Sequence, residues 1–182
     1  MWIGTSKGGN FVKLLGLGKD SKEAYFEMSN GEIWNFIEGY LDSIELSSYE
    51  YEGKQREVMI RHLKDEDSSF DLSTSFTRTS RTFINCLASV PKIDGIVRLS
   101  VYTTEKDWKI YKNWSLFHGW QKRDRKHDRE SQKKLTRVIE DPETKEYIKT
   151  DYTKLNDMMK DEIKAINKKI TKKEFEVEEQ PF

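Results

Sequence analysis

The sequence has one cysteine, Cys86, and no apolar run that approaches the length of a membrane span. One cysteine excludes an internal disulfide and a cysteine-rich zinc site, and a helical span needs about 20 predominantly apolar residues. The opening stretch, MWIGTSKGGNF, lacks the basic segment and the continuous apolar segment of a secretory signal peptide. These absences predict a soluble, cytoplasmic protein.

Motifs of catalysis are also missing. Neither GxGxxG nor GxxxxGK[ST], the Gly-rich loops that hold phosphates, is present, and there is no GxSxG motif for a nucleophile. The three histidines, His62, His118 and His127, lack metal-ligand spacing. Cys86 falls near the apolar face of an expected helix, where it is interpreted as a small core residue rather than a nucleophile. We therefore predict no enzyme, no cofactor and no metal site.

Charge is abundant and unevenly distributed. Charged residues make up 35% of the chain, against about 25% in an ordinary globular domain, and hydrophobic residues only 35%. The net charge is −4 over residues 1–97, +7 over residues 98–137 and −3 over residues 138–182. A neutral chain with one strongly basic stretch can present a local field that binds anions, although a solvated loop is the alternative.

The pattern between residues 31 and 120 predicts five strands and one helix. Alternating stretches rich in aromatic and β-branched residues indicate the strands, and Gly39 marks a bend in the first of them. The strands are expected at 32–46, 55–63, 70–79, 95–104 and 107–120, with a helix at 79–90. This is the order of the OB-fold, a five-stranded Greek-key barrel that commonly binds oligonucleotides or oligosaccharides. An SH3-like barrel and a small α+β sheet are the alternatives.

The remaining segments are expected to surround this core at 31–120. Residues 1–30 form a Gly-rich extension, and residues 121–150 form a basic loop too polar to pack, followed by a hairpin around Asp141 that adds to the barrel edge. Residues 151–171 have the apolar spacing of an amphipathic helix, either docked on the barrel or free for a partner. Residues 172–182, KKEFEVEEQPF, are too acidic and polar to order themselves.

Basic and aromatic residues lie close together in this sequence, as single-stranded nucleic acid requires. A basic groove follows the phosphates and exposed rings stack on unpaired bases. Phe83 and Trp114 are assigned to the core by their spacing, whereas Tyr102, Trp108 and Tyr111 are expected to lie outside it. The candidate nucleic-acid-binding residues are Arg61, Arg78, Arg81, Arg98, Tyr102, Trp108, Lys109, Tyr111, Lys112, Lys122 and Arg123. For each cation, a solvated surface position is the alternative.

The last seven residues, EVEEQPF, combine acids with a closing proline and phenylalanine. With the strand order and the aromatic-basic mixture, they give a chain that resembles the single-stranded DNA-binding proteins of bacteria and their phages. In that family an N-terminal OB-fold binds DNA, and a flexible acidic tip docks onto replication and repair proteins. The resemblance places the tip at Glu176, Glu178, Glu179, Pro181 and Phe182. Gln180, the glutamates and the missing long linker depart from the family pattern and suggest a divergent, phage-like member.

The resemblance implies a protein that coats single-stranded DNA in replication or recombination and recruits partners through its tip, in the host cytoplasm if phage-encoded. RNA stays open as a ligand because stacking does not sense the 2′-hydroxyl. A homo-oligomer also stays open. The alternatives are an OB-fold interaction protein of a virion or replisome that binds no DNA, and a metal-dependent nuclease using Asp65, Glu66 and Asp67.

Overall fold

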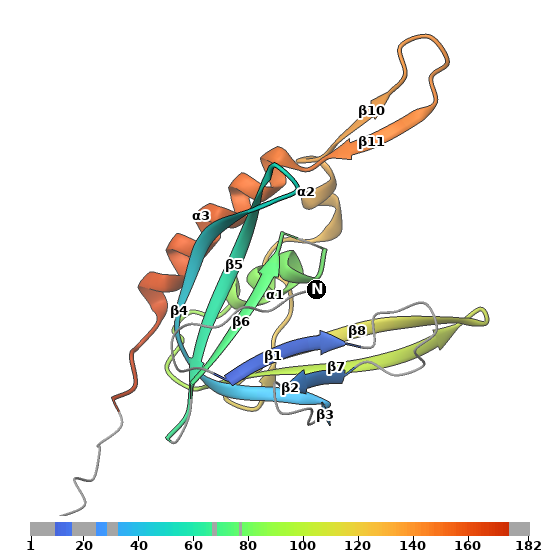
Figure 1. Ribbon diagram of the computed structural model, residues 1–182. Helices are drawn as coiled ribbons and strands as arrows, with labels where there is room; N and C mark the ends of the chain where they lie inside the picture. Colours follow the sequence, from blue (N-terminus) through green and yellow to red (C-terminus); the bar gives the residue numbers. More distant parts are fainter. Residues whose placement is uncertain (1–9, 16–24, 29–32, 67–68, 77, 175–182) are drawn as a thin grey trace, which may run out of the picture.

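The computed structural model describes residues 10–15, 25–28, 33–66, 69–76 and 78–174. The protein is mainly β, as predicted, with a long helix toward the C-terminus (Figure 1). The strands are β1 (Asn10–Leu15), β2 (Tyr25–Met28), β3 (Ile33–Trp34), β4 (Phe36–Tyr51), β5 (Lys54–Lys64), β6 (Ser69–Ser75), β7 (Ile96–Lys106), β8 (Lys109–His118), β9 (Gln121–Lys122), β10 (Arg137–Glu140) and β11 (Tyr147–Asp151). The helices are α1 (Arg78–Ala88), α2 (Arg129–Lys133) and α3 (Thr153–Lys169).

Strand β4 is long and pairs with a different neighbour along each part of its length. Residues 36–40 pair with β7, and residues 40–51 pair with β5, with a register shift between Leu41 and Ser43. Gly39 lies at this transfer, where an added Cβ would come 3.0 Å from the carbonyl oxygen of Lys64. The glycine therefore permits the close approach of β5 at the predicted bend. Glu52 and Gly53 both have positive φ, which matches the tight turn expected of a two-residue hairpin.

The large sheet has the order β3-β2-β1-β6-β5-β4-β7-β8-β9 and is antiparallel except for the pair β1 and β6. Its five central strands are the five that the sequence predicts, in the order third, second, first, fourth, fifth. In the part of the chain that the structure describes, no ladder joins β6 to β8, and β1 occupies the free edge of β6 that closure would need. The predicted closed barrel is therefore not confirmed, and the sheet is open.

The core lies between this sheet and the helices α1 and α3. Ile84 and Leu87 of α1 and Met159 and Ile166 of α3 are fully buried with Met59 of β5. The side-chain amide of Asn167 accepts a hydrogen bond from the backbone N–H of Ile44, at 2.9 Å, and donates one to its carbonyl, at 2.8 Å. Helix α3 is thus fixed along β4 (Figure 1).

Arg61 lies in this core, so its predicted position among the nucleic-acid-binding residues at the surface is wrong. It is 0% exposed, on the same face of β5 as the buried Met59 and Leu63. Its Nη1 donates to the carbonyl of Leu72 at 3.3 Å and to Thr74 Oγ1 at 2.9 Å, and its guanidinium lies 4.3 Å from the centre of the Phe83 ring. Burial lowers the pKa of Arg61 to about 9. It cannot reach a nucleic acid.

The charge run after residue 120 is packed against the protein, whereas its polarity predicts a free loop. The side-chain amide of Asn85 in α1 brackets His127, with two hydrogen bonds of 2.7 Å to its backbone. Lys126 Nζ and His127 Nε2 lie 2.7 and 2.8 Å from Oε1 of Glu162, which is buried in α3. Burial raises the pKa of Glu162, but the hydrogen bonds from Lys126 and His127 outweigh it, so the pKa is lowered. These contacts hold the basic segment against both helices.

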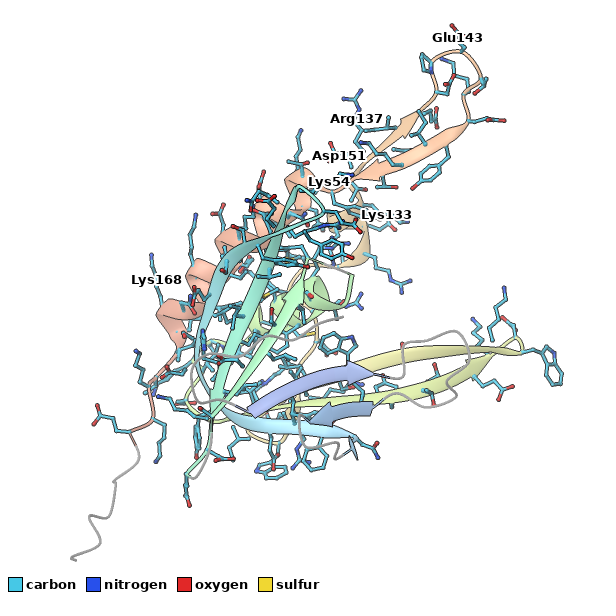
Figure 2. All side chains as sticks on the ribbon, viewed as in Figure 1. Lys54, Lys133, Arg137, Glu143, Asp151 and Lys168 are labelled. Atoms are coloured by element: carbon cyan, nitrogen blue, oxygen red, sulfur yellow. The ribbon has the colours of Figure 1, made fainter. Side chains whose placement is uncertain are left out.

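The predicted hairpin around Asp141 exists, but it does not extend the large sheet. Strands β10 and β11 form a separate two-stranded sheet. Figure 2 shows this hairpin, with Arg137 and Glu143, extending beyond the helices, while Lys133 lies at its base. The hairpin therefore adds a wall beside α2 rather than a strand at the sheet edge.

Candidate nucleic-acid interface

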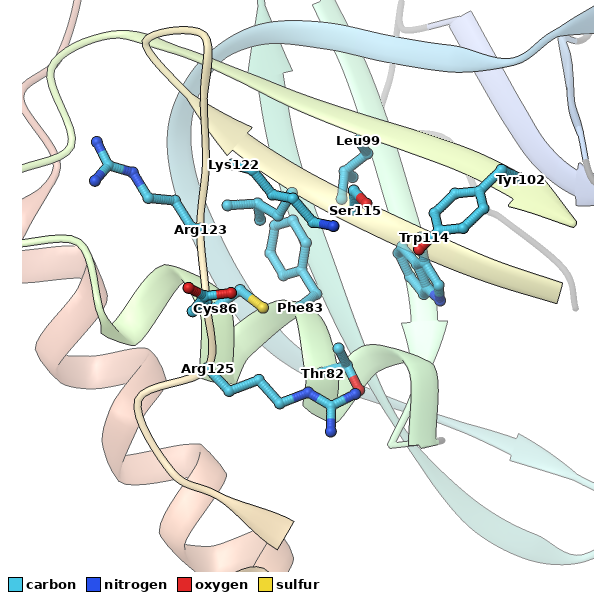
Figure 3. Close-up of a pocket in the computed structure, with 12 residues that line it drawn as sticks. Thr82, Phe83, Cys86, Leu99, Tyr102, Trp114, Ser115, Lys122, Arg123 and Arg125 are labelled. Atoms are coloured by element: carbon cyan, nitrogen blue, oxygen red, sulfur yellow. The ribbon is translucent and has the colours of Figure 1, made fainter. Parts of the chain in front are cut away.

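A hollow of about 320 Å³ lies between strands β7 and β8, helix α1 and the segment that follows β9 (Figure 3). We call it the first hollow. It is lined by Thr82, Phe83, Cys86, Leu99, Tyr102, Trp114, Ser115, Leu116, Lys122, Arg123, Asp124 and Arg125. The hollow exists because residues 123–128 run beside α1, where Glu162 and Asn85 anchor them.

The first hollow has an apolar floor and a basic rim. Phe83, Leu99 and Leu116 are buried side chains of the floor. In Figure 3, Lys122 extends toward Trp114 and Arg125 extends toward Thr82. Aromatic rings and cations therefore face the same space, the combination that binds bases and phosphates together.

Two polar groups near the first hollow are held in their neutral forms. Burial raises the pKa of the Cys86 thiol, and Arg125 only partly opposes this, so the sulfur is a poor nucleophile. Burial and the charge of Arg123 lower the pKa of His118, whose Nε2 accepts a hydrogen bond from the backbone N–H of Gly95 at 3.2 Å. Arg123 Nη2 donates to the His118 carbonyl at 3.4 Å, which directs Arg123 away from the hollow (Figure 3).

A second hollow, of about 670 Å³, adjoins the first, and the two share Thr82 and Arg125. It lies between α1, α2, the start of α3 and the β10–β11 hairpin. Its lining residues are Arg81, Thr82, Arg125, Arg129, Gln132, Lys133, Thr136, Val138, Thr150, Tyr152 and Leu155. We call the two hollows together the basic groove. Asp124 is the one carboxylate among the described residues that line it.

Most cations of the basic groove have no acid partner among the described residues. Within the described ranges, Arg81, Lys122, Arg123, Arg125 and Arg129 form no ion pair, and all of these except Arg123 face the groove. Lys133 pairs with Glu130 at 2.8 Å, and both side chains are exposed, so this pair is weak. The groove therefore combines four cations that face it without an ion pair, Arg81, Lys122, Arg125 and Arg129, with the rings of Tyr102, Trp114 and Tyr152.

Of the residues that the sequence nominates, the structure brings Arg81, Tyr102, Lys122 and Arg123 into the basic groove. Arg98 lies elsewhere and is engaged within the fold. Its guanidinium stacks between the rings of Phe36 and Trp120, at 4.3 and 4.4 Å, and pairs with Glu38. Its charge is thus neutralised, and the exposed Trp120 covers it.

Trp108 and Lys109 lie at the tip of the β7–β8 hairpin, outside the groove. Asp107 and Trp108 have φ of 52° and 60°, so they form the turn itself, and Trp108 is 95% exposed. The side chains of Arg78, Tyr111 and Lys112 lie outside the described part of the structure. The tip residues Glu176, Glu178, Glu179, Pro181 and Phe182 lie outside it as well.

Several groove residues are not among the candidates that the sequence predicts. Arg125, Arg129 and Lys133 belong to the basic stretch 98–137, so its charge excess was the available signal. Trp114 was assigned to the core, and it does pack against the core, but it is only partly buried and also lines the first hollow. No pattern in the sequence pointed to Tyr152.

The nuclease alternative gains no support from the described residues. Among the described residues, no three His, Cys, Asp or Glu side chains form a group that could hold a metal ion. Asp67 lies outside the described residues. Where the structure describes the chain, no helix is long and apolar enough to cross a membrane. No family model matches this chain, and neither a curated protein nor a solved structure matches it.

Proposed function

We propose that this protein binds single-stranded nucleic acid, above all single-stranded DNA, in the basic groove and without a catalytic step. The observation that carries the proposal is the convergence of Arg81, Lys122, Arg125 and Arg129, none in an ion pair within the described residues, with three aromatic rings. Cations neutralise phosphates with release of counterions, and rings stack on bases at about 1–3 kcal/mol per base.

The position of the rings favours single strands over duplex. Trp114 and Tyr102 lie in a hollow whose floor is apolar, so only a base that leaves a stack can reach them. In a duplex the base faces are covered by their neighbours, and a protein reads groove edges and phosphates instead. Stacking inside a hollow therefore selects unpaired bases of either DNA or RNA.

We infer further that β4, β5, β6, β7 and β8, with α1, are an OB-fold whose barrel stays open. Three observations support this inference: the order of the strands, the helix between the third and fourth strands, and the bend of the first strand near Gly39. OB-folds also bind through the loops of their first and last hairpins. In this chain those turns carry Tyr51 and Trp108, which are exposed. We propose Trp108 and Lys109 as a second contact beyond the groove.

The resemblance to single-stranded DNA-binding proteins of bacteria and phages supports a role in replication or recombination. Under this proposal the tip from Glu176 to Phe182 recruits replication or repair proteins. A terminal ring and its carboxylate suit an apolar pocket beside a basic residue, a form of C-terminal capture.

A titration tests the proposed function. Fluorescently labelled oligo(dT) is titrated with the full chain at two salt concentrations, with a duplex of equal length as the control. We expect tight binding of the single strand, a clear loss of affinity at the higher salt and weaker binding of the duplex. A salt-independent affinity, or a preference for the duplex, would contradict the proposal and favour a protein-interaction role.

A further inference from the structure

The second hollow differs from the first in its charge. Three arginines, Arg81, Arg125 and Arg129, line it from three separate segments, and Lys133 adds a fourth cation. No carboxylate is among the described residues that line it. Its neutral polar groups, such as Gln132 and Thr136, add hydrogen-bonding capacity. The hollow is therefore suited to an anion with more than one charge.

Arg81 gives the second hollow a rigid and uncompensated positive charge. It is buried, and its Nη1 donates to the carbonyl of Phe76 at 2.8 Å and to the amide oxygen of Asn156 at 3.2 Å. Its guanidinium stacks 4.4 Å from the centre of the Tyr152 ring. These partners are neutral acceptors and a ring, so they fix the guanidinium without cancelling its charge. Burial also lowers the pKa of Arg81, as expected for a cation without a counterion.

The shape of the second hollow suits the end of a strand. On one side it borders the first hollow at Thr82 and Arg125. The hairpin supplies another wall through Val138 and Thr150, which face each other across β10 and β11. A strand that lies in the first hollow would therefore bring its next phosphate to the arginines beside this wall.

We propose that the second hollow binds a phosphate monoester, the group found at the end of a nucleic-acid strand or on a mononucleotide. This inference rests on the proposed function of the basic groove. A phosphodiester carries one negative charge, whereas a monoester carries about −1.5 to −2 near neutral pH and has three terminal oxygens. Guanidinium groups bind such oxygens in pairs of parallel hydrogen bonds. Three arginines without a carboxylate match the monoester better than the diester.

The test compares oligo(dT) strands of one length that carry a 5′-phosphate, a 3′-phosphate or hydroxyls at both ends. We expect one phosphorylated strand to bind about 10-fold more tightly than the hydroxyl strand, the effect of one added charge-assisted contact. The preference should shrink below about pH 6, where the monoester gains a proton. The end that gives the preference identifies the polarity of the strand in the groove.

Two variants and one small ligand make the test decisive. Arg129→Gln should remove the preference for the phosphorylated end, while Arg137→Gln, an exposed change on the hairpin outside the second hollow, should retain it. Equal affinity for all three strands would overturn the inference and leave the proposed function standing. If no strand binds, the proposed function fails, and titration with thymidine monophosphate decides the inference. If the protein binds thymidine monophosphate and Arg129→Gln weakens that binding, the inference is supported. If thymidine monophosphate does not bind, the inference is overturned.

Discussion

Arg125 is the one cation among the described residues that lines both hollows, so its removal is the sharpest perturbation of the basic groove. Its side chain is exposed and forms no ion pair with a described residue. Replacement by glutamine keeps a polar side chain with an N–H donor but shortens it and removes the charge. We therefore expect Arg125→Gln to weaken binding of a single strand and to leave the melting temperature almost unchanged.

The size of the effect follows from counterion release. Each phosphate that a protein neutralises on a single strand contributes about −0.7 to the slope of log K against log salt. Arg81, Lys122, Arg125 and Arg129 are the four cations that face the groove without an ion pair in the described chain, so the slope should be about −2.8. Loss of Arg125 should reduce it to about −2.1, and the two proteins should converge in affinity as salt rises.

The assay is the fluorescence anisotropy of labelled oligo(dT), titrated at several sodium chloride concentrations. Arg137→Gln is the matched control, because Arg137 is an exposed arginine on β10 that lines neither hollow. Its slope should equal that of the unmodified protein. An unchanged slope for Arg125→Gln, or an equal decrease in both variants, would refute the assignment of the groove.

Four further changes test separate parts of the account. Trp108→Ala should cost about 1–3 kcal/mol of single-strand affinity without changing the melting temperature. Trp114→Ala should lower the affinity and should also lower the stability of the fold by about 2 kcal/mol, because that ring packs on the core. Arg61→Met should stabilise the fold by about 1–4 kcal/mol in thermal unfolding, because it removes a buried charge that forms no ion pair with a described acid. A lower stability would show that the two hydrogen bonds of Arg61 are worth more than the cost of burying its charge. Glu162→Gln should lower stability at neutral pH, and the difference should vanish as pH falls through the lowered pKa of Glu162. A difference that persists in acid, where the carboxyl group is protonated, would contradict the ion pair. Removal of residues 174–182 should leave DNA binding intact or tighten it at low salt, and it should abolish the pull-down of replication proteins. If the truncated protein retains the same partners, the proposed recruiting role of the tip is refuted.

Local patterns explain why the central strands could be predicted from the sequence. Alternation along β5 and β7, the turn at Glu52 and Gly53, and the apolar spacing of α3 are all encoded within short windows. The open sheet is different. It depends on the parallel pairing of β1 with β6, a contact between segments far apart in the chain. No local signal in the sequence specifies that pairing.

The candidate site, like the fold, can be predicted only in part from local sequence patterns. Arg61 shares its strand face with Met59 and Leu63, so alternation already placed it inside, but its charge led to a surface assignment. The charge of the stretch 98–137 indicated a basic surface without saying which cations converge. That choice depends on the anchoring of Lys126 and His127 by Glu162, which only the folded chain reveals.

Ultraviolet cross-linking of bound oligo(dT), with mass spectrometry of the linked peptides, tests the central claim most directly. The account predicts links in the peptides that hold Tyr102, Trp114 and Tyr152, the three rings of the basic groove. Links confined to Tyr49 or Trp120, which are exposed rings outside the groove, would place the nucleic acid elsewhere and contradict the account.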